Sequence, residues 1–565
     1  MNKGFIPKLN ACKDKNGRIL GEENKIIERW TQHYQEKLNP QAEIQTERIQ
    51  YLTAEIELKP PDILDTEIAI QKLKNNRTPG EDSITAELIK KGGPKLIEVF
   101  HKLITSIWEK EVMPKEWNNG LIFSIFKKGD KLECDNYRGI TLLNIAYKVL
   151  SNIIMNRINF FAEEILEECQ CGFRCGRGTT EQIFIIRQLM EKCFEFNTEL
   201  HFLFVDFKQA FDSINRIELI NAIESFGIPK KLVRLVNMAM ENNKAKVIMD
   251  GNVGKDFDVK QGVRQGDGLS AVLFNLALDK VIKELKLKGN ILYKSKQACV
   301  YADDIALIAR NVASLQEMLV TIKEIGMKYG LNINEAKTKY MKMEPKLGNI
   351  RQTTNIKLDE YTFERVTNFK YLGVIVNNKA DIKQEISNRI LMANRAYFTN
   401  NKLLKSKLIS RSTKIQIYKT LIRPVATYAA ETWTLNISDE NTLRIFERRI
   451  IRKIYGPICE NGLWRVRHNL EINDLLQGKD IVRHIKSLRL SWLGHLERME
   501  NERSPKNILN GEIIGVRRRG RPKKRWLQNV WDDINTMRVT GWREKARDRD
   551  IWRRIVKEAK AHKGL

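Results

Sequence analysis

Two adjacent carboxylates, Asp303 and Asp304, stand between two short apolar stretches of the sequence. Residues 298–300 (Ala-Cys-Val) and 305–308 (Ile-Ala-Leu-Ile) predict two buried strands that meet at a tight turn. Burying two unpaired carboxylates is costly, and a divalent cation would relieve that cost. For an isolated pair, the alternative interpretation is a solvated Asp-Asp turn between surface strands.

A third acidic residue favours the metal-binding interpretation. Asp206 directly follows residues 202–205 (Phe-Leu-Phe-Val), which predict another buried strand. Three carboxylates at neighbouring strand ends are the ligands that two-metal phosphoryl transfer needs. In that chemistry one metal ion activates an attacking 3′-hydroxyl, and the other holds a triphosphate and the leaving group. The sequence therefore predicts a metal site made by Asp206, Asp303 and Asp304.

Composition limits the class of protein. The 565 residues, 42% of them hydrophobic, are enough for several globular domains. A net charge of +28 and a pI near 9.6 indicate a polyanionic partner, and favour nucleic acid over an anionic membrane. No apolar run approaches the roughly 18 residues of a membrane span, and the N-terminus lacks an apolar signal core. Eight cysteines in so long a chain do not suggest a disulfide scaffold, so a reducing compartment is favoured. We expect an intracellular protein of the nucleus and cytoplasm.

Several elements must position the three acids. Residues 22–38 carry apolar side chains at helical spacing, and the strand predicted at 121–126 is closed by Lys127 and Lys128. Together with Arg138, these lysines could converge on a triphosphate, or they could be surface residues of a hairpin. The glycine-rich segment 261–268 would let the backbone approach a ligand closely.

The second half of the chain reads as increasingly helical and basic. Residues 315–329 predict a helix, 369–374 a strand and turn, and 381 to about 500 mostly helix. The last 65 residues carry 19 Lys or Arg against 8 Asp or Glu, a net charge of +11. We therefore expect the C-terminal part to contact nucleic acid.

In their order and their amino-acid sequences, these blocks resemble the reverse transcriptases of non-LTR (LINE-type) retrotransposons, in particular the endonuclease–reverse transcriptase type of animal elements. The resemblance is strong from about residue 65 to 375, and a family-like extension continues to about 555. The segment 301–304 (Tyr-Ala-Asp-Asp) resembles the family's catalytic Tyr-x-Asp-Asp box. Segment 206–212 (Asp-Phe-Lys-Gln-Ala-Phe-Asp) resembles the first catalytic motif, which implies Asp206 as a metal ligand and Phe211 as an aromatic gate against a ribose 2′-hydroxyl. The alternative for Phe211 is a core aromatic.

The resemblance also implies roles for residues that bind the nucleotide and the template. Segment 262–266 resembles the loop that contacts template and incoming nucleotide, which assigns Gln265 and Gly266 to nucleotide binding, although the family's usual proline is Gly268 here. Lys337 resembles a lysine near the triphosphate that acts as general acid, with a solvated lysine as the alternative. The fingers would bind the triphosphate through Lys127, Lys128 and Arg138. Arg174 would lie against the template, and Tyr371, Leu372 and Gly373 would form the primer grip.

The implied fold is α+β: a right-hand polymerase with fingers, a palm with an antiparallel sheet and a helical thumb, followed by a basic, mostly helical C-terminal extension. We expect an N-terminal helical extension at 1–60, fingers and palm at 61–380, a thumb at 381–435 and a nucleic-acid-binding region at 436–565. No endonuclease domain is recognised before the polymerase, and no cysteine follows Cys459 to form a zinc knuckle.

The resemblance implies an RNA-directed DNA polymerase that uses two Mg²⁺ ions, with Mn²⁺ as the alternative ion. Its partners would be template RNA, a DNA primer or target, and dNTPs, and no membrane is expected. An endonuclease would either have been lost from the same chain or act in trans. The alternative is a truncated or host-recruited, inactive protein that binds RNA or DNA. An intron-type maturase is less favoured by the wording of the motifs.

The densest basic run consists of Arg517, Arg518, Arg519, Arg521, Lys523, Lys524 and Arg525. Gly520 and Pro522 disfavour a helix there and predict an extended strip that holds nucleic acid. The alternative is a nuclear address. Trp526, which follows, would either pack the strip onto the next helix or stack on an unpaired base.

Overall fold

The fold is taken from a computed structural model, which describes residues 11–39, 48–49, 58–287, 296–343, 355–513, 515–517, 523–562 and 564–565. The chain forms two compact units, each assembled from segments that are not contiguous in the sequence. The first contains Met1–Arg174, Asp206–Lys286 and Leu319–Asn334, and the second contains Cys175–Val205, Leu287–Met318 and Glu335–Leu565. In the described ranges, no helix combines the length and the apolar character that crossing a membrane requires.

The first unit contains a five-stranded sheet in the order β4-β3-β6-β7, with β8 beside β6. Its strands are β3 (Asn119–Phe126), β4 (Tyr137–Leu143), β6 (Lys244–Met249), β7 (Asn252–Val253) and β8 (Phe257–Asp258). β3 confirms the strand predicted at 121–126. The sequence did not identify β4, because Arg138 and Gly139 interrupt its apolar pattern.

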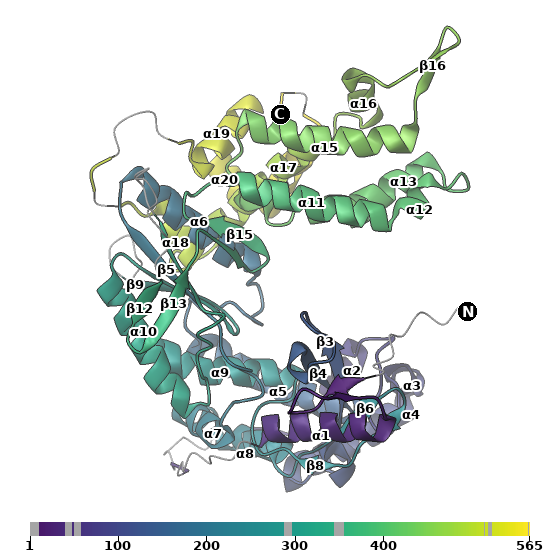
Figure 1. The fold of residues 1–565 in the computed structure, drawn as a ribbon, viewed down its shortest axis with the longest axis vertical. Coiled ribbons are helices and arrows are strands. Elements are labelled where there is room, and N and C mark those ends of the chain that lie inside the picture. The colour runs from purple at the N-terminus through teal and green to yellow at the C-terminus, as the bar shows by residue number, and fades with distance from the viewer. Residues whose placement is uncertain are drawn as a thin grey trace. The chain divides into compact units, whose positions relative to one another are not determined.

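Helices make up most of the rest of the first unit (Figure 1). The amphipathic helix predicted at 22–38 is α1, which buries Ile26, Trp30 and Tyr34 in one apolar cluster with residues of β3, β4 and β6. α10 (Val312–Lys328) begins in the second unit and ends in the first. The other elements are β1 (Cys12–Lys13), β2 (Ile19–Leu20), α1 (Glu23–Leu38), α2 (Ile63–Lys72), α3 (Ala86–Lys91), α4 (Gly93–Lys110), η1 (Lys115–Asn118), η2 (Cys134–Asn136), α5 (Ile145–Ile165), α7 (Arg216–Ser225), α8 (Lys230–Met240) and α9 (Gly268–Glu284).

The second unit contains a six-stranded sheet in the order β12-β13-β11-β5-β10-β9. All neighbouring strands are antiparallel except β11 and β13, in agreement with the antiparallel sheet expected for a palm. The fully buried β5 lies between β10 and β11, and α6 (Thr179–Glu195) packs against this sheet. The strands are β5 (Leu200–Val205), β9 (Lys296–Tyr301), β10 (Asp304–Ala309), β11 (Lys339–Met343), β12 (Ile356–Leu358) and β13 (Tyr361–Arg365).

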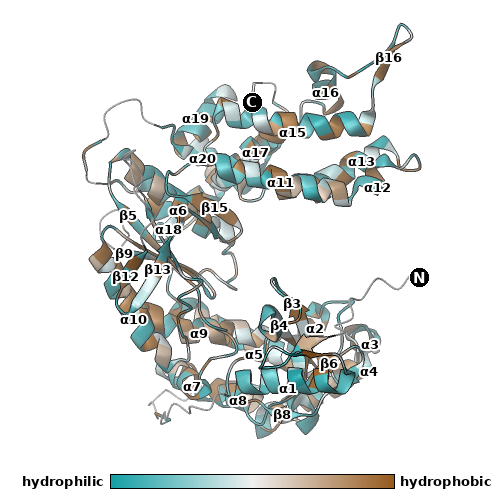
Figure 2. Cartoon of the chain, in the orientation of Figure 1, coloured by the Kyte–Doolittle hydropathy of each residue, from teal (hydrophilic) through white to brown (hydrophobic). Residues whose placement is uncertain are grey.

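The chain beyond β13 is mostly helical, as predicted. α11 and α15 lie side by side (Figure 1), and both carry a mixture of hydrophilic and hydrophobic residues (Figure 2). Their buried residues recur at helical spacing, as expected for helices with one buried face. The elements are β14 (Asn368–Tyr371), β15 (Val374–Asn377), α11 (Lys383–Thr399), α12 (Asn401–Lys405), α13 (Arg411–Ile417), the π-helix η3 (Tyr418–Ile422), α14 (Arg423–Ala426), η4 (Ala430–Thr432), α15 (Ile437–Tyr455), β16 (Ile458–Glu460), β17 (Leu463–Arg465), α16 (Asn469–Leu475), α17 (Ile481–Arg498), α18 (Ser504–Asn510), α19 (Trp526–Thr536), α20 (Trp542–Arg547) and α21 (Arg549–Ala559).

The C-terminal helices share a core with α6. Phe184 of α6 lies in one apolar cluster with Leu490 of α17, Trp526 of α19 and Trp552 of α21. The C-terminal region therefore belongs to the same compact unit as the six-stranded sheet. The predicted domains (extension, fingers and palm, thumb, and tail) follow one another along the sequence, whereas each compact unit combines separate segments. The predicted domain division therefore stays a prediction.

Candidate active site

The β9–β10 hairpin presents the two adjacent acids at its turn. Tyr301 pairs with Asp304, so Ala302 and Asp303 are the central residues of the turn. Ala302 is buried and has a φ of 55°, the sign that the first central residue takes in type II′ turns. Asp303 is half-buried and Asp304 is exposed. The predicted strands and tight turn are confirmed.

Asp206 directly follows β5, the strand that neighbours β10. Val205, the last residue of β5, pairs with Ile305, and directly opposite residues of antiparallel strands lie about 4.5–5.5 Å apart. Asp206 and Asp304 are the chain neighbours of this pair. The end of β5 and the start of β10 thus meet, as the sequence predicted for the strands that carry the acids.

The backbone after β5 is held in place by residues that precede β11. Lys208 donates its backbone N–H to the Asn332 carbonyl at 2.8 Å, and Asn334 donates to the Asp206 carbonyl at 2.8 Å. Phe207 forms an antiparallel bridge with Ile333 between these two bonds. These contacts fix the direction in which the chain leaves the acid.

The donor chemistry of the three acids suits a hard divalent cation, because Mg²⁺ prefers carboxylate oxygens. Asp303 is half-buried and Asp304 is exposed, whereas Asp206 is half-buried as a residue and has one carboxylate oxygen that is fully buried. Within the described ranges, no three His, Cys, Asp or Glu side chains are gathered into a formed metal site. Asp206, Asp303 and Asp304 fit a metal by donor type and strand position, and their role as ligands stays a prediction.

Phe211 lies within the first acidic motif, five residues after Asp206, and is half-buried. Its ring stacks on Phe274 of α9 with centroids 4.3 Å apart and an interplanar angle of 13°. The exposed Phe173 meets the same ring edge-on at 6.3 Å. The packing on Phe274 holds the ring rigidly while leaving part of it accessible, a combination that a steric gate requires.

The glycine-rich loop lies against β4. Thr141 donates its backbone N–H to the Gln265 carbonyl at 2.7 Å. Gly266 has a φ of 129°, and a Cβ there would lie 2.4 Å from the Thr141 carbonyl oxygen, so only glycine fits. Gly268 is the first residue of α9, a position that also tolerates the proline usual in the resembled family.

Asp267, between these two glycines, is a structural residue that the sequence did not single out. Its carboxylate caps α9 by accepting from the Leu269 backbone N–H, and it accepts from the Tyr147 hydroxyl at 2.6 Å. An acid directly before an apolar helix was the available signal.

Lys127, Lys128 and Arg138 lie where the β3–β4 hairpin meets its connecting loop. Phe126 pairs with Tyr137, and Lys127 donates its backbone N–H to the Asn136 carbonyl at 2.8 Å. All three basic side chains are exposed. The structure therefore brings these residues together on one hairpin, and their contact with a triphosphate stays a prediction.

Arg174 does not present its side chain to a template. Its side chain is 3% exposed and pairs with Glu163 at 3.0 Å. The guanidinium also donates to the carbonyls of Leu166, Glu167 and Gln170. Arg174 closes the turn after α5, so the predicted template contact of this side chain is wrong.

Tyr371 is likewise a core residue rather than a side-chain contact to a primer. It is 2% exposed, packs on Phe204 of β5 and donates its hydroxyl to the Cys299 carbonyl at 3.4 Å. Leu372 and Gly373 form the β14–β15 turn, with φ values of 44° and 86°. Tyr371 thus fastens this hairpin to β9, and only the turn that follows remains available for the predicted primer grip.

Lys337 lies in the turn before β11 and is exposed. An exposed ammonium group at this position is compatible with contact to a triphosphate and also with the solvated alternative. Its role as general acid stays a prediction.

The basic run near the C-terminus is partly engaged with the protein. Arg517 and Arg525 both pair with Glu195 of α6, at 2.6 and 2.5 Å, and these bonds lower the pKa of Glu195. Lys524 pairs with an acid of α19 at 2.6 Å, and Lys523 donates to a backbone carbonyl at 2.9 Å. The remaining predicted members, Arg518, Arg519 and Arg521, lie outside the described residues.

Trp526 is fully buried. Its ring meets Phe184 edge-on at 5.0 Å, its indole N–H donates to the Glu431 carbonyl at 2.8 Å, and its backbone N–H donates to Glu191 at 2.8 Å. Trp526 is itself the first residue of the following helix, and it packs on α6, so stacking of this buried ring on an unpaired base is wrong.

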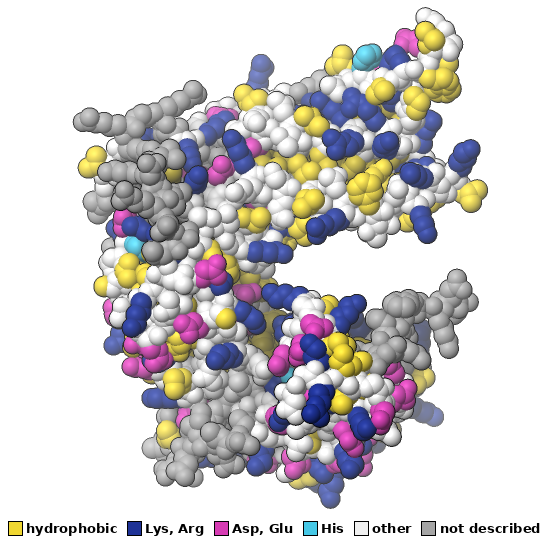
Figure 3. Space-filling model, viewed as in Figure 1, with side chains coloured by type: hydrophobic (Ala, Val, Ile, Leu, Met, Phe, Trp, Pro, Cys, Tyr) yellow, Lys and Arg dark blue, Asp and Glu magenta, His cyan; other side chains and the backbone are white. Residues whose placement is uncertain are grey.

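Basic side chains gather over the helical part of the second unit. Figure 3 shows dark-blue groups over α11 to α13 and α15, with apolar groups among them. Exposed members of this basic surface are Lys402, Lys405, Lys407, Arg411, Arg449 and Lys453.

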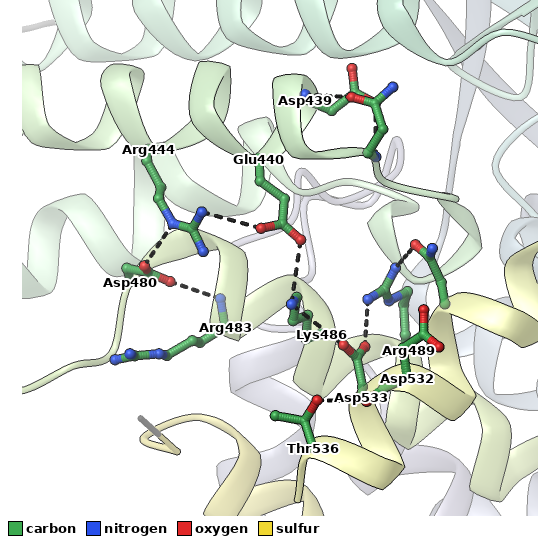
Figure 4. Close-up of polar contacts among 12 residues, drawn as sticks. Asp439, Glu440, Arg444, Asp480, Arg483, Lys486, Arg489, Asp532, Asp533 and Thr536 are labelled. Carbon is green, nitrogen blue, oxygen red and sulfur yellow. Dashed lines mark hydrogen bonds and ion pairs between the residues drawn. The ribbon is translucent and has the colours of Figure 1, made fainter. Parts of the chain in front are cut away.

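Ion pairs join α15, α17 and α19 (Figure 4). Arg489 of α17 is 1% exposed in its side chain and pairs with Asp533 of α19. Lys486 bridges Asp533 and Glu440 of α15, at 3.4 and 3.3 Å, and Arg444 pairs with Glu440 at 3.1 Å. These charges link the predicted C-terminal region internally from α15 to α19.

Comparison with known proteins identifies one family model. Residues 125–376 match the model described as reverse transcriptase (RNA-dependent DNA polymerase). The matched residues contain all three predicted acids, Phe211 and the glycine-rich loop.

Relatives with curated descriptions cover a larger part of the chain. The RNA-directed DNA polymerase from mobile element jockey of Drosophila funebris is 26% identical over 405 residues, which are 68% of this chain and 43% of that protein. The probable RNA-directed DNA polymerase from transposon X-element of Drosophila melanogaster is 25% identical over 445 residues, 77% of this chain and 48% of the relative. This chain therefore spans less than half the length of these two proteins. Among solved structures, apo telomerase from Candida tropicalis aligns over 73% of this chain and 74% of its own, with 13% identity and a TM-score of 0.38.

Proposed function

We propose that this chain is the RNA-directed DNA polymerase of a non-LTR retrotransposon, because residues 125–376 match the reverse transcriptase model and its relatives are described as such polymerases. It extends a DNA 3′-hydroxyl with dNTPs on an RNA template. The observation that supports this most is the pairing of Val205 with Ile305, because it brings together the strand ends that carry Asp206 and Asp304.

Asp206, Asp303 and Asp304 would hold two Mg²⁺ ions, or Mn²⁺ as the alternative, and the ions would supply Lewis acidity at the 3′-hydroxyl and the triphosphate. The protein's own contribution is positioning and charge stabilisation, because phosphoryl transfer needs no covalent intermediate on the enzyme. Lys127, Lys128 and Arg138 donate charge-assisted hydrogen bonds to the triphosphate.

Three further residues complete the mechanism. Phe211 excludes a ribose 2′-hydroxyl by its bulk, and the Phe274 ring behind it prevents its retreat. Gly266 lets the loop lie directly against β4, because no Cβ meets the Thr141 carbonyl, and the loop in this position contacts the nucleotide. Lys337 donates a proton to the departing pyrophosphate.

Nucleic acid binds to the basic surface over α11 to α13 and α15. Exposed Lys and Arg side chains there neutralise backbone phosphates, and the apolar groups among them contact sugars and bases. The partners are template RNA, a DNA primer or target, and dNTPs, and no step requires a membrane. An endonuclease would make the initiating nick, in cis or in trans, and the protein would work in the nucleus after synthesis in the cytoplasm.

Primer extension by the purified chain tests this function. The same DNA primer is annealed to an RNA template and to a DNA template, with Mg²⁺ or Mn²⁺ and the four dNTPs. Extension on RNA supports the polymerase. Tight binding of either template without extension under any of these conditions would instead identify an inactive nucleic-acid-binding protein.

A further inference from the structure

Lys37, in the last turn of α1, forms an ion pair with Asp212 inside the first unit. The Lys37 Nζ and Asp212 Oδ2 atoms are 2.6 Å apart, and the two side chains are only 10% and 12% exposed. Asp212 directly follows Phe211, the proposed sugar gate. Lys37 lies before the matched residues 125–376, so an element outside the matched segment reaches the proposed nucleotide site.

The same carboxylate also holds the glycine-rich loop. Gln265 donates its side-chain amide to Asp212 Oδ1 at 2.7 Å. Each oxygen of Asp212 therefore has its own partner, one on α1 and one on the loop. A single side chain connects the helix, the Phe211 turn and the residue assigned to the nucleotide.

Backbone hydrogen bonds also tie the glycine-rich loop to the Phe211 turn. Val263 donates its N–H to the Phe211 carbonyl at 2.8 Å, and Gly262 donates to the Ile214 carbonyl at 2.8 Å. A Cβ at Gly262 would lie 2.5 Å from the Asp212 carbonyl oxygen, so the two backbones are in direct contact. The loop and the Phe211 turn must therefore move together.

The end of α1 touches this loop through its backbone as well. Gln261 donates its backbone N–H to the Leu38 carbonyl at 3.3 Å and its side-chain amide to the Lys37 carbonyl at 3.2 Å. α1 is itself anchored, because Trp30 and Tyr34 are buried and the Tyr34 hydroxyl shares a hydrogen bond with Ser124 of β3 at 2.9 Å. A rigid helix thus carries the ammonium group to Asp212.

We infer that Lys37 is a positioning residue of the nucleotide site: through Asp212 it sets the placement of Phe211 and Gln265. The inference rests on the proposed polymerase function. Without the ammonium group, Asp212 would be a largely buried and uncompensated charge, and it would turn toward solvent and release Gln265. The gate and the loop would then lose their common anchor.

The kinetic test compares Lys37→Met with Lys37→Arg and with the control Lys25→Met. Lys25 lies on the same helix, and its pair with Glu22 is exposed, so the control removes a charge far from the loop. Lys37→Met should raise the KM for dNTP about tenfold, as expected for loss of one charge-assisted hydrogen bond. It should also lower discrimination against ribonucleotides, with a smaller change in kcat. Lys37→Arg should recover most of both losses, and Lys25→Met should resemble the wild type.

A double-mutant cycle separates positioning from simple destabilisation. In an Asp212→Asn background the ion pair is already absent, so Lys37→Met should produce no further rise in KM. Equal effects of Lys37→Met in both backgrounds would overturn the inference. So would a Lys37→Met enzyme with wild-type KM and sugar selectivity.

A second readout does not depend on activity. Amide hydrogen exchange at Gly262 and Val263 should accelerate in Lys37→Met and not in Lys25→Met, because the loop loses its anchor. If the wild-type chain extends no primer but this exchange difference appears, the proposed function fails while the mechanical link stands. If the wild type is active and the exchange is unchanged, the inference fails and the proposed function stands.

Discussion

At the scale of single residues, Ala302 gives the acidic turn its shape. A left-handed φ costs a residue with a Cβ about 1 kcal/mol or more. The surrounding ladder compensates, because Tyr301 and Asp304 are paired and the Ala302 side chain is buried. The direction of the neighbouring Asp303 is therefore set by the backbone, as a ligand position requires.

Replacing Asp303 by Asn should abolish primer extension while leaving nucleic-acid affinity nearly unchanged. The substitution removes a charge from the predicted metal site, and the basic surface lies on other elements. Extension and filter binding are measured on the same preparation. The control is Asp135→Asn, whose side chain is 85% exposed. Near wild-type extension by the Asp303→Asn enzyme would remove the hairpin from the active site.

Replacing Phe211 by Val should increase incorporation of ribonucleotides relative to deoxyribonucleotides. The smaller side chain leaves room for a 2′-hydroxyl, and Phe274 holds the surrounding structure. Single-nucleotide incorporation of each sugar gives the ratio. Phe160→Val, at a ring that is 71% exposed on α5, serves as the control. An unchanged ratio in a folded Phe211→Val protein would make Phe211 a core residue only.

The acids could be predicted from the sequence because their neighbours encode strands and a turn locally. Arg174 and Tyr371 could not be assigned correctly, because burial depends on packing partners that the motif does not show. The Tyr371 hydroxyl bonds a carbonyl 72 residues away in the sequence, and Lys37 pairs with Asp212, which is also distant in the sequence. Neither contact leaves a pattern in the local sequence. Motif resemblance gives a residue's place in the chain, and the contacts decide what its side chain faces.

At the scale of elements, α19 is fastened to α6 by Trp526. The indole fills a core with Phe184 and bonds Glu431, while the helix start bonds Glu191. The sequence predicts an extended basic run before this helix, which stays a prediction, and it leaves open where Trp526 would point. Most helices and strands were predictable from apolar periodicity, whereas β4 lacked that signal.

Trp526→Ala should destabilise the second unit by about 3–5 kcal/mol, the usual cost of deleting a large buried aromatic side chain. Chemical denaturation followed by circular dichroism measures the loss. Trp531→Ala on the same helix removes an indole that is 38% exposed and should cost less than about 1 kcal/mol. Equal costs for the two variants would contradict the packing described for α19.

Substitutions can separate the residues of the basic run that are expected to bind nucleic acid from those that pair with Glu195. Changing Arg518, Arg519 and Arg521 to Gln should weaken nucleic-acid binding and lower its salt dependence by about one unit of slope per lost phosphate contact. Changing Arg517 and Arg525 to Gln should instead lower the melting temperature, because Glu195, which is 9% exposed in its side chain, loses both partners.

Extension on a saturating primer–template should survive the triple substitution, since no predicted metal ligand is changed. Affinity is followed as a function of salt concentration, and nuclear import is scored separately. If affinity and salt slope stay constant while import fails, the run is a nuclear address and not a binding element.

At the scale of the whole molecule, buried acids make stability depend on pH. Burial raises the pKa of Glu447 to about 7. The hydrogen bonds that Glu447 accepts from the Ile481 N–H and the Tyr418 hydroxyl act in the opposite direction but are outweighed. Burial also raises the pKa of Glu191 to about 7. The folded chain therefore holds protons that the unfolded chain releases near pH 4.5, so this contribution is complete below about pH 4.5 and is lost as pH rises to about 7.

Glu447→Gln should remove the part of this pH dependence of stability that comes from Glu447, and leave the part that comes from Glu191. Relative to the wild type, the variant should gain stability steadily between about pH 4.5 and 7, because its neutral amide has no proton to lose. Melting temperatures across this range give the difference, with the exposed Glu500→Gln as the control. Parallel pH profiles for Glu447→Gln and the wild type would show that folding does not shift the pKa of Glu447.

The contact between α6 and α19 has a consequence for synthesis on the ribosome. The Glu191–Trp526 bond spans 335 residues, which take on the order of 20–70 s to translate. During that time α6 has left the ribosome, yet the apolar face around Phe184 has no α19 to cover it. The nascent chain is therefore exposed to aggregation until its last helices emerge, and any product truncated before residue 526 keeps that exposed face permanently.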